Sequence, residues 1–427
     1  MFELKKNNLT VSVILVAIFI SYIIGFYFNE DSAGGGKIDY INHEWGTIQL
    51  FLQNDLKVAL NSILYESSRT PLFYIINKHI AGTYNIEGLR LFWFIFSLII
   101  PFLFYLTLKL IVSKKIDKSY ILLFSFVIFL SPYFRSNAYW PSSENLQIFF
   151  VILSLFFYIF LIKNKNIDKS RLYILSILSI LSAYCAFYTD QKAFFLVALI
   201  YFDLIRRNDL PFFLIFSFLN VLLFLPAIYL FISWGGLVPI ESQFRVSKFT
   251  QGSNIFISTI GIYFVLVFIS NFFNSNFWKI TKLQQIDFFF IFIISIFLFF
   301  SLPSIPITFG SGIISKLLGI ITVKFNLNWD IIKYIYFFIN LFFIVIIFLL
   351  TKKTFKNLII FSSFLLVYNL TSITYQSYLD PVIYIILLTV FDFKKNIDIF
   401  NIKTSYLFLI FYSSMLVSSI ILRTYII

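Results

Sequence analysis

The sequence predicts an all-α protein that crosses a membrane about 11–13 times. Of its 427 residues, 60% are hydrophobic and only 12% are charged, which leaves too few polar side chains to give most helices a water-facing side. Apolar runs of roughly 17–25 residues, the length that crosses the hydrocarbon core of a bilayer, recur along the whole chain. We therefore expect a polytopic α-helical membrane protein with no soluble domain.

Thirteen stretches of the chain have the composition of a membrane span. Two of them, near 193–205 and 380–392, are short, so we expect each to be tilted, broken or continued by a neighbour. The predicted spans lie near residues 10–28, 89–112, 119–135, 146–163, 171–188, 193–205, 211–232, 255–273, 287–303, 331–351, 358–374, 380–392 and 405–423.

The formal net charge of +13 is explained by where the basic residues lie. They concentrate in every second connection between the predicted spans, from Lys5 and Lys6 to Lys394 and Lys395, as the positive-inside rule requires of cytoplasmic loops. Nucleic-acid binding would need a contiguous basic face, which the sequence lacks, so no nucleic-acid partner is expected. We expect a multi-pass protein of a bacterial inner (cell) membrane, with its basic connections facing anionic headgroups.

The longest predicted connection, residues 29–88, lies on the opposite, outer side. Within it, the segment GTIQLFLQNDLKVALNSILY (residues 46–65) places isoleucines and leucines near one helical face and polar residues elsewhere. Residues 70–80 predict a second, shorter helix, with Pro71 near its first turn. We expect both helices to lie in the plane of the membrane interface.

Polar side chains gather directly after the first predicted span. Glu30 and Asp31 follow its last apolar residue, and the glycines at 34–36 leave room beside them. His43 adds another polar group further along the same connection. Two interpretations stay open: the acids simply mark the outer end of the span, or one of them lies in a partly buried cavity and acts as a general base.

A second polar cluster occupies residues 131–147, which read SPYFRSNAYWPSSENLQ. Glu144 fits both a first-turn acid of the following helix and a residue of an outer site. Arg135 either neutralises that acid or binds a phosphate through two parallel hydrogen bonds. For Trp140 we favour a place in the aromatic belt at the membrane interface.

Asp190 and Lys192 lie between two predicted spans with almost no loop. They form either an internal ion pair or a contribution to the same outer cavity. The chain has only two histidines and one cysteine, Cys185, so no metal site is predicted, although dependence on a divalent metal stays open.

This arrangement resembles the GT-C superfamily, whose glycosyltransferases use polyprenyl-phosphate sugars and include protein mannosyltransferases and the aminoarabinose transferases of lipid A. The resemblance depends on the long first outer connection, its two helices, the number of spans and the pair Glu30-Asp31. It implies that Asp31 deprotonates an acceptor hydroxyl, with Glu30 as the alternate base, and that Glu144 is a second acidic residue of the site. It also implies a catalytic module over residues 1–254, followed by further spans over 255–427.

In this superfamily, a basic residue of a later outer connection often stabilises the departing lipid phosphate, for which a guanidinium is well suited. Arg245 and Lys248 are the first candidates here, and Lys316 and Lys324 compete with them. In a protein without this function, these residues would only contact lipid headgroups.

The resulting hypothesis is an inverting membrane glycosyltransferase that needs no cofactor. It moves a sugar from a polyprenyl-phosphate donor to a lipid-linked, polysaccharide or protein acceptor on the outer (periplasmic) face. The alternatives are a lipid-linked oligosaccharide flippase or polymerase, which would place more charges inside the spans, and a non-catalytic scaffold. The expected substrate-binding residues are Glu144, Arg135, Asp190, Lys192, Arg245, Lys248 and His43.

Overall fold

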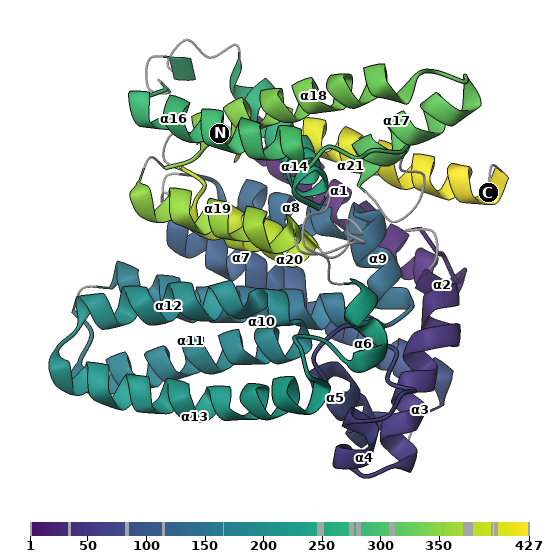
Figure 1. Ribbon diagram of the computed structural model, residues 1–427. Coiled ribbons are helices and arrows are strands. Elements are labelled where there is room, and N and C mark those ends of the chain that lie inside the picture. Colours follow the sequence, from purple (N-terminus) through teal and green to yellow (C-terminus); the bar gives the residue numbers. More distant parts are fainter. Residues whose placement is uncertain are drawn as a thin grey trace. The chain divides into compact units, whose positions relative to one another are not determined.

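The computed structural model of the protein is built of helices (Figure 1). Within the part of the chain that it describes, the single pairing of β type is an isolated bridge between Thr351 and Phe391. The described residues are 2–32, 36–81, 85–112, 116–164, 166–245, 252–272, 277–278, 283–306, 312–352, 354–369, 379–393, 396 and 400–425.

The chain forms two compact units. Unit 1 comprises Met1–Gln243 together with Phe408–Ile427, and unit 2 comprises Phe244–Leu407. The C-terminal helix therefore belongs mostly to the unit that also contains the N-terminal helix. Within unit 1, the Phe408 ring packs edge-on against that of Phe124, with 5.3 Å between centroids.

Unit 1 contains the candidate site and most of the helices. Its helices are α1 (Phe2–Tyr27), α2 (Gly36–Asp39), the π-helix η1 (Tyr40–Glu44), α3 (Trp45–Gln53), α4 (Leu56–Leu60), α5 (Leu72–Ala81), α6 (Ile86–Ser97), α7 (Ile99–Ile111), α8 (Lys118–Phe126), η2 (Val127–Leu130), α9 (Pro132–Tyr139), α10 (Ser143–Lys163), α11 (Lys169–Thr189), η3 (Gln191–Ala193), α12 (Phe194–Arg207) and α13 (Leu210–Trp234), followed by η4 (Ile240–Arg245) at its boundary and by most of α21 (Ile402–Tyr425).

The helices of unit 2 are α14 (Gly252–Phe272), α16 (Gln285–Phe300), α17 (Ile313–Lys324), α18 (Trp329–Leu350), α19 (Phe355–Asn369) and α20 (Asp380–Thr389). The unit is organised around α14, whose polar and small residues let its neighbours approach closely. A Cβ added at Gly261 would lie 2.1–2.5 Å from the Phe343 side chain of α18, so only glycine permits this packing. The Asn254 amide donates to the carbonyls of Leu298 and Ser301, where α16 ends, and thereby satisfies backbone acceptors in an apolar interior.

Eight helices in the described part of the chain are long and apolar enough to cross a membrane, which supports a multi-pass all-α fold. This number is below the predicted 11–13. Three of the predicted spans form α12, α16 and α20, which have 14, 16 and 10 residues, and the last residues of the span predicted over 358–374 lie outside the described part of the chain. At about 1.5 Å per residue, such helices fall short of the roughly 30 Å hydrocarbon core. The eight are Leu9–Tyr27, Ile86–Ile111, Ser143–Lys163, Lys169–Thr189, Leu210–Trp234, Gly252–Phe272, Trp329–Leu350 and Lys403–Ile421.

The span predicted over 119–135 is bent sharply. The segments Lys118–Leu130 and Pro132–Tyr139 meet at 65°, and they count as a ninth span only if taken together. Ser131 is extended and its side chain accepts a hydrogen bond from the backbone of Phe134, while Pro132 opens the next helix. Proline cannot donate to a preceding turn, so a new helix axis starts here.

In unit 1, the first outer connection packs against the ends of α11 and α13 (Figure 1). The Trp234 indole at the end of α13 donates to Leu60 O (2.9 Å), and the Thr70 hydroxyl donates to Phe187 O near the end of α11 (2.7 Å). The helix predicted over 46–65 is present as α3 and α4, separated by the extended residue Asp55, and the second predicted helix is α5. The first outer connection is thus mostly helical and packed against the bundle.

Candidate functional site

Glu30 and Arg135 form a buried ion pair that joins the end of α1 to α9. The guanidinium of Arg135, which is 2% exposed, donates from Nε to Glu30 Oε1 (2.8 Å) and from Nη2 to Oε2 (2.5 Å). It also donates to the carbonyls of Ser21 (2.9 Å) and Phe129 (3.1 Å). Both carboxylate oxygens of Glu30 are therefore engaged by a single cation, which makes this residue poorly suited to take a proton from a substrate.

Gly25 creates the space that this pair needs. A Cβ at this position would lie 2.4 Å from Arg135 Nη2 and 2.5 Å from Glu30 Oε2. The Tyr139 hydroxyl, which donates to Tyr22 O at 2.6 Å, would lie 2.8 Å away. The ion pair and the Tyr139 hydroxyl thus pack directly against α1 at Gly25, where no side chain blocks them.

Asp31 is held in a fixed position but stays partly exposed. Its carboxylate accepts the backbone N–H groups of Gly36 (3.0 Å) and Lys37 (3.2 Å), at the start of the helical run formed by α2, η1 and α3. The Ser136 hydroxyl of α9 lies 3.4 Å from the same carboxylate. An acid at a helix start is favoured by the exposed N–H groups there, so a capping role accounts for part of this geometry.

The residues on either side of Asp31 are anchored to α9 and its surroundings. Glu30 is bound by Arg135 as described, and the Glu30 carbonyl accepts from the Trp140 indole at 3.0 Å. Ser32 is buried, and its hydroxyl donates to Pro132 O at 2.8 Å. Asp31 is therefore a partly exposed carboxylate in a short segment whose neighbours are fixed.

A cleft of about 600 Å³ opens beside this segment. The Lys37 ammonium lies 5.4 Å from the centroid of the Trp140 ring, and the Arg90 guanidinium lies 3.7 Å from it. Trp140 itself is 4% exposed, so it is packed inside unit 1 and does not belong to the predicted aromatic belt. The cleft is lined by Asn29, Lys37, Ile41, Trp45, Asn85, Ile86, Glu87, Arg90 and Trp140.

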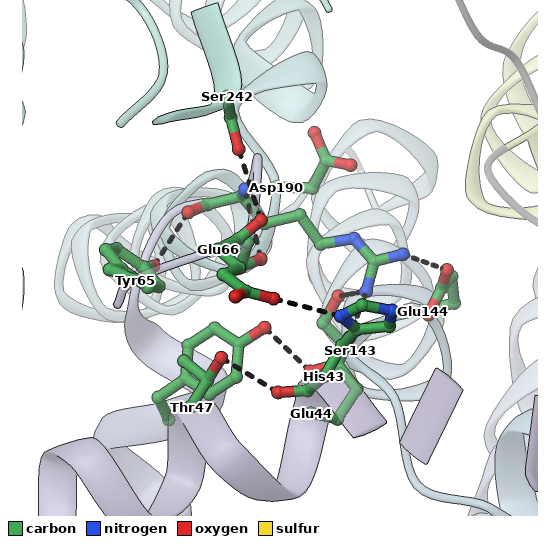
Figure 2. A network of polar contacts seen from close by, with 12 residues as sticks. His43, Glu44, Thr47, Tyr65, Glu66, Ser143, Glu144, Asp190 and Ser242 are labelled. Carbon is green, nitrogen blue, oxygen red and sulfur yellow. Dashed lines mark hydrogen bonds and ion pairs between the residues drawn. The ribbon is translucent and has the colours of Figure 1, made fainter. Parts of the chain in front are cut away.

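A second buried network, which includes Glu44, Ser143 and Glu144 (Figure 2), surrounds Arg69 and joins the first outer connection to the start of α10. The Arg69 guanidinium pairs with Glu144 and with Glu44, the latter at 3.4 Å, and donates to the Ser143 hydroxyl at 2.7 Å. The Tyr74 hydroxyl donates to the other oxygen of Glu44 (2.7 Å). Glu144 thus pairs with Arg69, and Arg135 pairs with Glu30, so the interpretation in which Arg135 neutralises Glu144 was wrong.

This network holds more negative than positive charge. Two carboxylates share one guanidinium, and burial raises the pKa of Glu44, with the charges of Glu144 and Asp39 adding to the effect. Arg69 and Tyr74 act in the opposite direction. Glu144 is 5% exposed, and its Oε2 has no hydrogen-bond partner among the described residues. A buried carboxylate oxygen without a donor is costly, so it marks a place where a further donor would be favourable.

The remaining predicted site residues have separate settings. Asp190 and Lys192 form an internal ion pair, one of the two interpretations offered for them, with 3.6 Å between Oδ2 and Nζ and both side chains mostly buried. His43 is exposed and lies 3.0 Å from Glu66, outside the buried network (Figure 2). Arg245 ends η4, but its side chain lies outside the described part of the chain, as does Lys248.

Sequence reasoning missed the arginines and the lysine that organise this end of unit 1. Arg69 and Arg90 lie within or next to the long outer connection, where basic residues are not expected from topology. An arginine at such a place is a signal for a buried ion pair, because its planar fork suits carboxylates better than lysine does. Lys37 follows the glycines that we noted, but its partner Trp140 is 103 positions further along the chain.

Known proteins give no direct assignment. No family model matches the chain, and no curated protein or solved structure is significantly similar to it. Among the residues that the structure describes, no group of three or more His, Cys, Asp or Glu side chains is arranged to hold a metal ion.

Proposed function

We propose that this protein is a membrane glycosyltransferase of GT-C type, which transfers a sugar from a polyprenyl-phosphate donor to a hydroxyl acceptor at the outer face of the membrane. The observation that supports this proposal is the setting of Asp31. Its carboxylate is partly exposed, is oriented by two backbone N–H groups, and lies between two anchored residues at the end of a membrane-spanning bundle.

Asp31 is the residue best placed to act as the general base. A base must be fixed within reach of the acceptor and must keep an oxygen accessible to it. Glu30, the alternate candidate, is bound at both oxygens by Arg135, so its place is that of an anchor. Asp31 is partly exposed, and the backbone N–H groups of Gly36 and Lys37 orient its carboxylate.

The proposed reaction is a single displacement at the anomeric carbon. The acceptor O–H gives its proton to Asp31 while its oxygen forms the new bond to the sugar carbon. The bond from that carbon to the phosphate oxygen breaks at the same time, and the polyprenyl phosphate leaves with the electron pair, so the anomeric configuration is inverted. Cationic side chains beside the phosphate would stabilise the charge that it carries away.

Asp31→Asn tests this proposal directly. Membranes that contain the protein are supplied with labelled polyprenyl-phosphate hexoses and pentoses, and label in glycan, lipid and protein fractions is measured. We expect at least a hundredfold loss of transfer in the variant, the scale of a lost general base, at unchanged protein amount and thermal stability.

Asp55→Asn provides the matched control. Asp55 is an exposed acid of the same outer connection that precedes α4 without a side-chain cap, so its neutral variant should transfer normally. Undiminished transfer by Asp31→Asn would reject Asp31 as the base, and a wild-type protein inactive with every donor would reject the function itself.

A further inference from the structure

We propose that the cleft beside Trp140 binds the phosphodiester of a membrane lipid. This inference concerns binding alone, so it goes beyond glycosyl transfer and stands or falls separately from it. The lipid is either a glycerophospholipid or a polyprenyl-phosphate sugar, since both present one phosphate with a single negative charge between an apolar and a polar part.

The position of the cleft in the chain places it at headgroup level. Asn29 lies two residues beyond the candidate span Leu9–Tyr27, and Ile86 is the first residue of the span Ile86–Ile111. Both line the cleft, so it lies where one apolar helix ends and another begins. The ends of membrane-spanning helices lie at the boundary between hydrocarbon and headgroups, where lipid phosphates are found.

Exposed apolar residues line the cleft or stand next to its lining residues in the chain. Tyr27 and Phe28, directly before Asn29, are 76% and 81% exposed. Ile41, which lines the cleft, is 44% exposed, and Leu91, next to Arg90, is 47% exposed. In water such exposure would be unfavourable, whereas acyl or prenyl chains would cover these side chains.

The two cations of the cleft have unused capacity for an anion. Lys37 is exposed and contacts the Trp140 ring, and it forms no ion pair within the described ranges. Arg90 donates from Nε to Tyr139 O, from Nη1 to Glu87 and from Nη2 to Asn29, all at 2.7–2.8 Å. A guanidinium has five N–H donors, so three acceptors leave two N–H groups for a ligand.

The charge of the cleft suits one phosphodiester. Lys37 and Arg90 contribute two positive charges and Glu87 one negative charge, which leaves a net charge of +1 to match the single negative charge of a diester. The Arg90 side chain is only 3% exposed and is fixed over Trp140, so its donors are oriented in advance. Glu87 is 70% exposed and is free to turn toward water when a phosphate approaches.

The test measures lipid binding to the full-length protein in detergent. Thermal unfolding and native mass spectrometry are recorded during titration with three probes: dioleoyl phosphatidylglycerol, a polyprenyl-phosphate hexose and inorganic phosphate. The variants are Lys37→Glu and, as matched control, Lys57→Glu, which reverses an exposed charge of the same outer connection on α4.

We expect at least one lipid probe to bind wild-type protein and Lys57→Glu alike, and to bind Lys37→Glu at least tenfold more weakly. The probe that shows this dependence identifies the lipid class. Equal binding of both lipids by all three proteins would overturn the inference, and so would a Lys37-dependent effect of inorganic phosphate as large as that of any lipid. The titration contains no acceptor, so its outcome is read independently of the transfer assay.

Discussion

Arg135 holds both carboxylate oxygens of Glu30, although 105 positions separate the two residues in the chain. The pair lies across Gly25 and fixes the turn that leaves α1, in which Asn29 has a left-handed backbone conformation (φ 53°). This relationship divides the roles of two adjacent acids. Glu30 anchors the turn, and Asp31, the next residue, is presented at the surface of the bundle.

The first prediction concerns the strength of this anchor. Glu30→Gln leaves the Arg135 charge buried without a counter-ion, which typically costs about 3–5 kcal/mol. We expect a clear loss of thermal stability for Glu30→Gln and for Arg135→Gln, measured by intrinsic fluorescence on protein in detergent. The double variant should lose less than the sum of the two single losses, because both remove the same interaction. Strictly additive losses would contradict a functional pairing of these side chains.

The second prediction uses two glycines as a matched pair. Gly25→Ala should lower the stability of the protein by about 1–3 kcal/mol, the usual cost of overpacking, because the methyl group would collide with Arg135 and Glu30. Gly46→Ala in α3 should be neutral or slightly stabilising, since a Cβ there meets nothing within 4 Å and alanine favours helix. Thermal unfolding of both variants gives the comparison. Equal stability of the Gly25→Ala and Gly46→Ala variants would mean that the ion pair does not pack against α1 at Gly25.

Local features of this chain follow from the sequence, and its long-range pairings do not. The helix α5 is set by neighbours along the chain, so periodicity was sufficient to predict it. For Asp190 and Lys192, which are also close in sequence, the ion pair was one of the two interpretations that the sequence left open. The pairs of Arg135 with Glu30 and of Arg69 with Glu144 join segments 105 and 75 positions apart. One sequence gives no means of choosing among such partners, since every carboxylate is a chemically equivalent choice for a guanidinium.

The number of spans shows a different limit. Hydrophobicity alone does not separate a helix that crosses the bilayer from a shorter one packed against its neighbours. The chain at 287–303 is as apolar as the candidate spans, yet α16 ends at Phe300. The Asn254 amide donates hydrogen bonds to the carbonyls of Leu298 and Ser301 at this end of the helix. Trp140 illustrates the same point, because its place in the sequence suits an interfacial residue while its contacts with Arg90 bury it.

The third prediction concerns the pH dependence of the Arg69 network. Burial raises the pKa of Glu44 above its ordinary value, so the folded protein binds this proton more tightly than the unfolded chain does. The stabilisation that Glu44 contributes by binding its proton more tightly in the folded state is therefore fully present below the unfolded pKa of about 4.3. That contribution is lost as the pH rises through the higher pKa of the folded state.

Glu44→Gln should remove this loss, because a neutral amide can still accept from Tyr74 and leaves Arg69 paired with Glu144 alone. We expect the variant to gain stability relative to the wild type between pH 4 and pH 7, with the difference largest at the upper end. Glu66→Gln serves as control, since Glu66 is 55% exposed and pairs with His43 at the surface. Thermal unfolding in detergent across this pH range measures the effect, and a Glu44→Gln variant that loses stability as the pH rises, relative to the wild type, would show that the ionised carboxylate is needed by Arg69.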